Sequence, residues 1–319
     1  AFNALRRPAP LRRPTTTQMV VSDEPMLATG PGGGGLFTSS DPEQRRVVPD
    51  SVDGRASFKV VYVVLESQYQ ASMTKAAKKI NQKQEGVCIE VVGYLLEELR
   101  DPANFERFKA DVQDANIFIG SLIFVQELAE KVVEAVEPLR DQMDAVVIFP
   151  SMPEVMRMNK VGSFTMANLG QSKSIVADFM KQKKAQDGSS FEEGMLKLLR
   201  TLPKVLKYLP GDKAKDAKSF MMTFQYWLGG SPENLESMLL NLADNYVTGV
   251  VGTNVVAETD IVEPILLPDT GIWHPLAPRV FEDVTDYLQW YNSEHAPAVG
   301  INPAAAPTVG VILQKSHIN

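Results

Sequence analysis

The chain has 319 residues, enough for about two domains at roughly 150 residues each, and its 32 basic and 39 acidic residues give a net charge of −7. The first 22 residues hold four arginines and no acid, so the remainder has 28 basic against 39 acidic residues, or −11. That acidity argues against a general nucleic-acid binder, which needs a basic surface for phosphate contacts. Cys88 is the one cysteine, which excludes an intrachain disulfide framework and a cysteine-based zinc site. No apolar run approaches the ~20 residues that span a bilayer.

The N-terminal segment, residues 1–57, is predicted to be a transit-peptide-like leader followed by a flexible linker. Its first 21 residues are rich in arginine and hydroxyl side chains and free of acids, which is the composition of an organellar transit peptide. The alternative is a plain disordered basic tail. The glycine run at 30–35 follows no strand and opens no helix, so we interpret it as linker rather than as a phosphate-binding loop.

From Phe58 onward the sequence alternates between strand and helix patterns. Four apolar, β-branched runs predict strands buried on both faces, at residues 59–65, 87–92, 116–121 and 145–150. Between them apolar residues recur at three- and four-residue spacing, and Asp101 followed by Pro102 is a typical helix start. Because crossover helices connect parallel strands, the pattern predicts an α/β fold, with a parallel-sheet, flavodoxin/Rossmann-like domain over residues 58–188.

Sites in such sheets lie beyond the carboxyl ends of the strands. Those ends supply our first candidate residues for contact with a ligand or partner: Glu66, Gln68, Ser121 and Glu154. The first turn lacks the glycines of a dinucleotide fingerprint, and no segment has the spacing of a phosphate-binding P-loop. For Glu66 the alternative is a helix cap or hydrogen-bond anchor rather than an acid catalyst.

A basic block follows at residues 157–218, where 13 basic residues stand against six acids. One reading is a solvated helix face, and the other is a docking patch for an acidic partner or an anionic membrane surface. Helices are predicted from Phe191, over 212–228 and from Ser231 with Pro232 in its first turn. We therefore expect a helical region over residues 189–263.

The last block, residues 264–319, is predicted to be the start of a further α/β domain. Apolar runs at 265–268 and 308–313 predict strands, and the second lies so near the last residue that the sequence looks cut inside that domain. Alternatively, that strand joins a sheet built upstream or on a partner. The loop after the first run carries further candidate contacts: Asp269, Trp273 and His274. A packed structural role is the alternative for His274. The other histidines, His295 and His317, lie in unrelated segments and show no metal-ligand spacing with it.

Several long runs resemble one family. They include KVVYVVLESQYQ, VVGYLLEELRD, DANIFIGSLIFVQELAEKV, MDAVVIFPSMPEVMRMNKVGSFTM, LKLLRTLPKVLKYLPGDKAKDA, WLGGSPENL, DTGIWHPLAP and VGVILQKSHI. These runs are similar to the N-terminal part of the large, porphyrin-binding H subunit of magnesium chelatase, of plant and algal type. Those after Trp227 also resemble the wider group that includes the cobaltochelatase large subunit.

The resemblance implies a chloroplast protein of chlorophyll biosynthesis, in the stroma or at a membrane surface. It implies two AAA+ type partner subunits that use ATP to drive Mg²⁺ into protoporphyrin IX, and a porphyrin-carrying activator protein. The family's segments for porphyrin and metal lie beyond the part matched, so we assign this chain no catalytic residue, no metal ligand and no cofactor of its own, and expect it to be inactive alone. Its expected role is assembly, substrate access or partner docking. The alternative is a stand-alone, non-enzymatic plastid scaffold or tetrapyrrole-binding protein.

Overall fold

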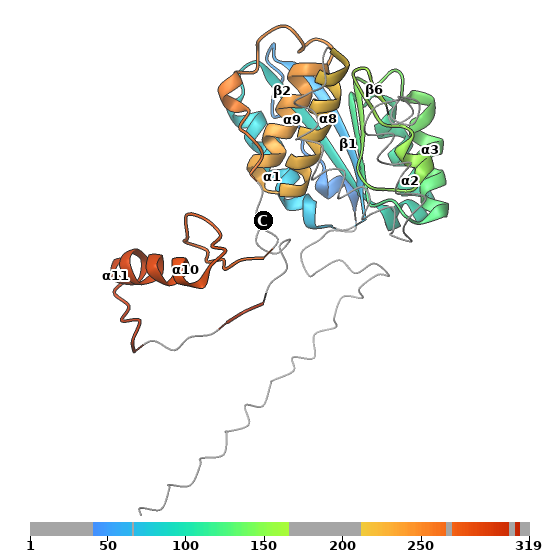
Figure 1. Ribbon diagram of the computed structural model, residues 1–319. Coiled ribbons are helices and arrows are strands. Elements are labelled where there is room, and N and C mark those ends of the chain that lie inside the picture. Colours follow the sequence, from blue (N-terminus) through green and yellow to red (C-terminus); the bar gives the residue numbers. More distant parts are fainter. Residues whose placement is uncertain (1–40, 66, 166–211, 266–269, 306–309, 313–319) are drawn as a thin grey trace, which may run out of the picture. The chain divides into compact units, whose positions relative to one another are not determined.

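The computed structural model describes residues 41–65, 67–165, 212–265, 270–305 and 310–312 (Figure 1). The strands are β1 (Ala56–Val64), β2 (Val87–Leu95), β3 (Ile117–Ser121), β4 (Ala145–Ile148), β5 (Lys160–Val161) and β6 (Phe164–Thr165). The helices are α1 (Gln70–Lys83), α2 (Pro102–Gln113), α3 (Gln126–Val136), α4 (Pro153–Met156), α8 (Asp212–Gly229), α9 (Pro232–Tyr246), α10 (Val284–Trp290) and α11 (Ala296–Ala298). Short 3-10 turns are η1 (Pro42–Arg45), η2 (Ser67–Tyr69), η3 (Leu96–Arg100), η4 (Glu137–Leu139) and η5 (Glu258–Asp260), and η6 (Tyr291–His295) is a π-turn.

The strands form one sheet in the order β2-β1-β3-β4-β5-β6. The first four are parallel, as the apolar runs predicted, and the short β5 and β6 add an antiparallel edge that the sequence analysis did not anticipate. Gly93 of β2 stands beside Tyr62 of β1. A Cβ at Gly93 would lie 2.0 Å from the Tyr62 ring, so glycine is what allows this buried ring to lie across the neighbouring strand.

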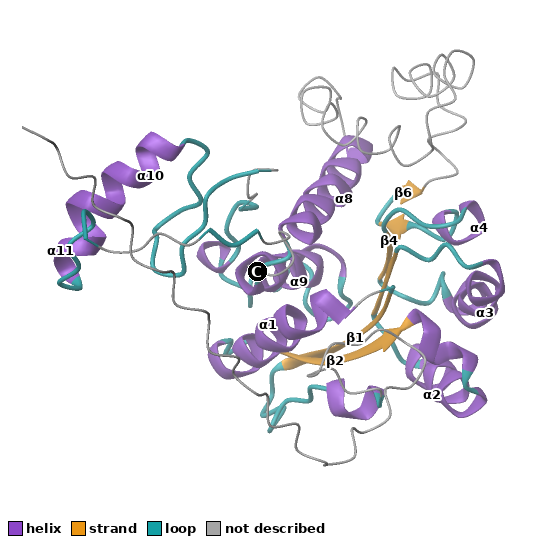
Figure 2. Ribbon diagram, turned by 90° about the horizontal axis from the view of Figure 1, so that it is seen from below, coloured by secondary structure: helices purple, strands orange, loops and turns teal. Residues whose placement is uncertain are grey.

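Helices cover both faces of the sheet, as Figure 2 shows: α1, α8 and α9 lie on one side and α2, α3 and α4 on the other. The helix start predicted at Asp101 is confirmed, because its side chain accepts a hydrogen bond of 2.9 Å from the backbone N–H of Asn104. The predicted apolar face of α1 is also confirmed, since four of its side chains are fully buried: Met73, Ala76, Ala77 and Ile80.

One continuous cluster of buried apolar side chains runs from Val47 to Val256. The helices predicted over 212–228 and from Ser231 are confirmed as α8 and α9, and both contribute to this cluster. The described part of the predicted helical region is therefore a layer of the α/β domain and not a separate body. The predicted helix from Phe191 lies outside the described residues, and the domain boundaries at 188 and 263 stay predictions.

The predicted linker is wrong for residues 41–57. This stretch holds η1, the start of β1, and an antiparallel bridge in which the N–H of Val47 donates to the carbonyl of Val91 at 2.8 Å and the reverse bond measures 2.9 Å. Composition misled the prediction, because polar residues that pair with distant charges look the same in sequence as solvated ones. Residues 1–40 lie outside the described part of the chain.

Residues 270–305, which we call the C-terminal module, hold α10, η6 and α11. An antiparallel bridge joins Ile272 and Phe281, and Asp283 caps α10 by accepting from the N–H of Thr285 at 2.6 Å. The strand predicted at 265–268 falls mostly outside the described residues. Of the run at 308–313, residues 310–312 have no regular structure and are exposed, and the strand predicted there stays a prediction.

Candidate functional site

The strand order places a topological switch point between β1 and β3. The chain leaves β1 through α1 to reach β2 on one side, and returns through α2 to reach β3 on the other. The carboxyl ends of β1 and β3 meet there, with Val64 paired in register with Ser121. Open α/β sheets bind ligands in the crevice at such a point. We therefore compared the predicted strand-end residues with the side chains that occupy it.

Three aromatic rings, which we call the aromatic stack, fill this end of the sheet. Trp227 of α8 lies between Tyr69, at a centroid distance of 4.2 Å, and Phe149, at 4.8 Å. The interplanar angles of 14° and 22° make both contacts stacked. The indole Nε1 of Trp227 donates a hydrogen bond of 3.1 Å to the hydroxyl of Ser121. Side chains of the chain itself thus fill this end of the sheet.

Of the strand-end residues predicted as contacts, Ser121 is the one that is hydrogen-bonded to the aromatic stack. It is only 3% exposed, and its oxygen is held by Trp227. Gln68 is exposed in η2, and Glu154 is half-buried in the first turn of α4. Glu66 lies outside the described residues. The structure thus closes the Ser121 position, while Gln68 stays accessible.

Sequence reasoning missed the three rings of the stack. Trp227 belongs to a helix more than 100 residues after Ser121, and nothing in the local pattern of α8 marks one of its apolar residues as reaching a strand end. The available signal was chemical: an indole N–H needs an acceptor when it is buried, and a hydroxyl at a buried strand end offers one.

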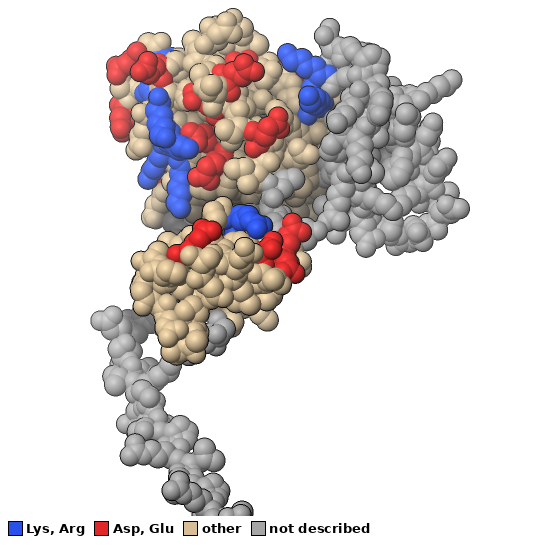
Figure 3. All heavy atoms as spheres, turned by 60° about the vertical axis from the view of Figure 1, so that its left-hand side comes forward, with Lys and Arg blue, Asp and Glu red and all other residues tan. Residues whose placement is uncertain are grey.

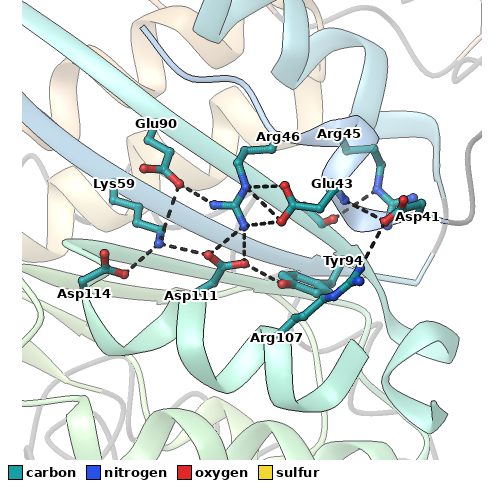
Figure 4. A network of polar contacts seen from close by, with 11 residues as sticks. Asp41, Glu43, Arg45, Arg46, Lys59, Glu90, Tyr94, Arg107, Asp111 and Asp114 are labelled. Atoms are coloured by element: carbon teal, nitrogen blue, oxygen red, sulfur yellow. Dashed lines mark hydrogen bonds and ion pairs between the residues drawn. The ribbon is translucent and has the colours of Figure 1, made fainter. Parts of the chain in front are cut away.

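A second group of polar side chains, the polar clamp, joins residues 41–46 to the sheet and to α2 (Figure 4). Asp111 of α2 is its centre. The carboxylate accepts from Arg46 at 2.8 and 2.9 Å, from Lys59 at 3.0 Å and from the hydroxyl of Tyr94 at 2.6 Å. Arg46 also contacts Glu90 of β2 and donates to Glu43 at 2.9 Å.

The pKa values in the clamp follow from these contacts. Burial alone raises the pKa of Asp111, but hydrogen bonds from Tyr94, Lys59 and Arg46 outweigh it and hold that pKa below its usual value of 3.8. Hydrogen bonds to Glu43 and Asp111 raise the pKa of Arg46 further above its usual range. Since each central charge is paired, the clamp holds fixed charges and offers no group poised to exchange protons. We therefore assign it a structural role.

The predicted DTGIWHP loop lies in the C-terminal module, apart from its first residue, Asp269, which is outside the described part. Trp273 is 41% exposed. His274 is half-buried, and its Nδ1 accepts a hydrogen bond of 3.1 Å from the N–H of Leu276. That bond needs an unprotonated Nδ1, so the neutral ring carries its proton on Nε2. The packed structural role is the one that this geometry favours for His274.

The expectation that His295 is unrelated to His274 is wrong. Their ring centroids are 4.5 Å apart, and Trp290 stacks on His295 at 5.3 Å. Burial, and secondly the neighbouring His295, lower the pKa of His274 below 6.5. The bridge between Ile272 and Phe281, helix α10 and the π-turn η6 bring the chain back over 21 residues, which the spacing of the two histidines did not reveal. Among the described residues no group of three or more His, Cys, Asp or Glu side chains has a geometry that would hold a metal ion.

Charged side chains of both signs are interspersed on the face that Figure 3 shows, with broad uncharged areas between them. The predicted basic block at 157–218 lies largely outside the described residues, so its docking role stays a prediction. In the part of the chain that is described, no helix combines the length and apolar character needed to cross a membrane.

Two family models match the chain. Residues 59–221 match a domain of unknown function (DUF3479), and residues 224–319 match CobN/Magnesium Chelatase. The boundary between the matches falls inside α8. The second match therefore begins on a helix whose Phe224 and Trp227 pack on Phe149, within the sheet of the first match.

Curated relatives agree with both matches. The magnesium-chelatase subunit ChlH, chloroplastic, of Oryza sativa subsp. indica is 53% identical over 291 residues, which are 90% of this chain and 20% of the relative. The magnesium-chelatase H subunit of Rhodobacter capsulatus is 32% identical over 219 residues, covering 68% of this chain and 17% of the relative. The corresponding protein of Cereibacter sphaeroides is 27% identical over 267 residues, covering 83% and 21%. The chain thus spans about a fifth of the length of the curated relatives it matches.

Proposed function

Because the chain belongs to the family of the magnesium chelatase H subunit and matches the N-terminal part of that subunit, we propose that its α/β domain anchors the start of the CobN/magnesium chelatase domain within it. In this role the domain serves chlorophyll biosynthesis through assembly and docking. ATP use and the insertion of Mg²⁺ into protoporphyrin IX then take place elsewhere in the complex, and this region holds no cofactor of its own.

The aromatic stack carries this proposal. Trp227 belongs to the second family match, but Ser121, Tyr69 and Phe149, which it contacts, belong to the first. Burying an indole between two rings fixes both the position and the rotation of α8 on the sheet, because the side chain has a single donor and that donor is paired. The start of the second match is therefore held in one orientation relative to the sheet.

A chimera tests this role. The rice relative, with its matched region replaced by this chain, should support ATP-dependent magnesium insertion together with the other chelatase subunits. Trp227→Ala in the chimera should lower that activity at least tenfold, because α8 loses the packing contacts that fix its position and rotation on the sheet. Leu228→Ala is the matched control, since Leu228 is adjacent on the same helix and 39% exposed. Circular dichroism first establishes that each variant is folded. A folded Trp227→Ala chimera with undiminished activity would contradict the proposal.

Partners and location follow from the same family. The H subunit works with other chelatase subunits, and we propose that these are two AAA+ type subunits, with a porphyrin-carrying activator protein as a further partner. The rice relative is chloroplastic by name, which supports a chloroplast location for this chain. A stromal position, with contact to a membrane or protein through the basic block, is part of the proposal.

Direct porphyrin contact is proposed for the accessible members of the candidate set. Trp273 is exposed and stands next to His274, whereas Ser121 is closed by Trp227. Binding of protoporphyrin IX, followed by the quenching of the porphyrin's own fluorescence, should therefore weaken in a Trp273→Phe, His274→Ala double variant. Gln68→Ala serves as the comparison at the strand ends. Unchanged quenching in the double variant would remove the loop from the candidate set.

A further inference from the structure

The C-terminal module buries few side chains of its own. Within residues 270–305 the apolar residues that are at least nine-tenths buried are Phe281, Trp290 and Ala296. Phe281 and Trp290 contact each other at 5.5 Å, and Tyr287 packs on both. A core of this size is far below what an independent unit needs, because units of fewer than about 40 residues bury too little apolar surface to be stable alone.

The same module exposes more large apolar side chains than it buries. Each of the following, which together we call the apolar face, is at least 40% exposed: Trp273, Leu276, Val284, Leu288, Val299 and Ile301. Val284 and Leu288 are four residues apart on α10 and so share one stripe of that helix. Single exposed apolar residues are ordinary, but six within 36 residues indicate a surface that is covered by something else.

The charges of the module indicate the character of the surface that would complement it. It carries one basic side chain, Arg279, against four acidic ones: Glu282, Asp283, Asp286 and Glu294. Arg279 is engaged internally, over the Phe281 ring at 4.5 Å and 3.4 Å from Asp286. A surface that complements this module therefore combines apolar and basic side chains.

We propose that the polypeptide that follows this region in the H subunit docks on the apolar face and completes the module's core. This rests on the proposed function, because it places the chain within that subunit. The CobN/Magnesium Chelatase match contains the whole module, and the matched region is only 20% of the rice relative. The remaining four-fifths of such a subunit is the polypeptide available beside the module. The face is thus an interface inside one subunit.

Cysteine accessibility tests this proposal in the intact proteins. Leu288→Cys on α10 and, separately, Leu276→Cys on the loop are made both in this chain and in the full-length chimera with the rice relative. The rate of maleimide labelling at each position is followed by peptide mass spectrometry. Val251→Cys is the matched control, because Val251 is 50% exposed and lies outside the module. The native Cys88 is buried.

We expect both module cysteines to react rapidly in this chain and at least tenfold more slowly in the chimera, with the control unchanged between the two. Slow labelling in both proteins would place the face against the chain's own α/β domain and overturn the proposal. Labelling that slows as the concentration of this chain rises would assign the face to a second copy. Equal, rapid labelling in both proteins would show that nothing covers it. Magnesium insertion by the chimera reports separately on the proposed function.

Discussion

Asp111 is the residue on which the N-terminal part of the fold depends most. It is 6% exposed, and it receives hydrogen bonds from η1, β1 and β2 neighbours at once. A buried carboxylate is costly without partners, so the loss of Arg46 or Lys59 would leave Asp111 with a single cation and raise the cost of its burial. Removing Asp111 would take from Arg46 and Lys59 the most buried anion that they share and leave Glu90 as their common partner.

We predict that Asp111→Asn lowers the free energy of unfolding by about 3 kcal/mol at neutral pH, as expected for breaking one side of a buried ion pair. The pKa of Asp111 is lower in the folded protein than its usual 3.8, so its contribution is complete above that value and is lost as pH falls through the folded pKa. Wild-type stability should therefore fall more steeply than that of Asp111→Asn from about pH 5 downward. Urea unfolding across this range measures both slopes, and parallel slopes would contradict the assignment.

Local contacts of single residues were predictable from the sequence, but contacts between distant residues were not. The Asp101 cap depends on contacts within three residues, and it was predictable. The contact between His274 and His295 depends on how the Ile272–Phe281 bridge, helix α10 and the π-turn η6 bring the chain back, which no local spacing encodes. The Trp227 contact with Ser121 depends on the docking of a helix 106 residues away.

At the scale of elements, the four parallel strands were predictable because a strand buried on both faces is an uninterrupted apolar run. The short β5 and β6 were not, since two residues carry no periodicity. The linker prediction for residues 41–57 was wrong for a different reason. Val47 pairs with Val91 because β2 is an edge strand with a free outer side, and the local sequence does not reveal that.

That bridge leads to a prediction for Val47→Pro. Proline has no N–H to donate, so the 2.8 Å bond to the Val91 carbonyl is lost and this carbonyl stays unpaired at the sheet edge. We expect a loss of about 1–3 kcal/mol in the free energy of unfolding. Val47→Ala is the control that removes the side chain but keeps the bond. Urea unfolding and amide exchange around β2 measure the difference, and equal exchange in the two variants would argue against a role for the backbone bridge.

At the scale of the whole molecule, the continuous core from Val47 to Val256 means that sheet and helical layers depend on one another. Lys79 of α1 and Glu236 of α9 form an ion pair, and Tyr226 of α8 donates to the carbonyl of Val262 at 2.5 Å. These contacts join helices on one face of the sheet to the segment that follows α9.

We predict that β1, β3 and α9 unfold in one transition, and that Trp227→Ala shifts all three together by about 3–5 kcal/mol, the usual cost of truncating a buried tryptophan. Hydrogen exchange followed by mass spectrometry over a urea series resolves the segments. The C-terminal module, with its small core, should lose protection at a lower urea concentration. If α9 unfolded before β1 and β3 in the wild type, the single core would be refuted.

The polar clamp also sets a limit on proteolytic trimming of the N-terminus. A protease that cut between Arg45 and Arg46 would remove Asp41 and Glu43, and a cut just after Arg46 would take from Asp111 one of its two cations. Arg45 is only 6% exposed and contacts Glu98, so this part of the backbone is a poor protease substrate while the domain is folded. A form of the chain that keeps every contact of the clamp therefore begins no later than Asp41.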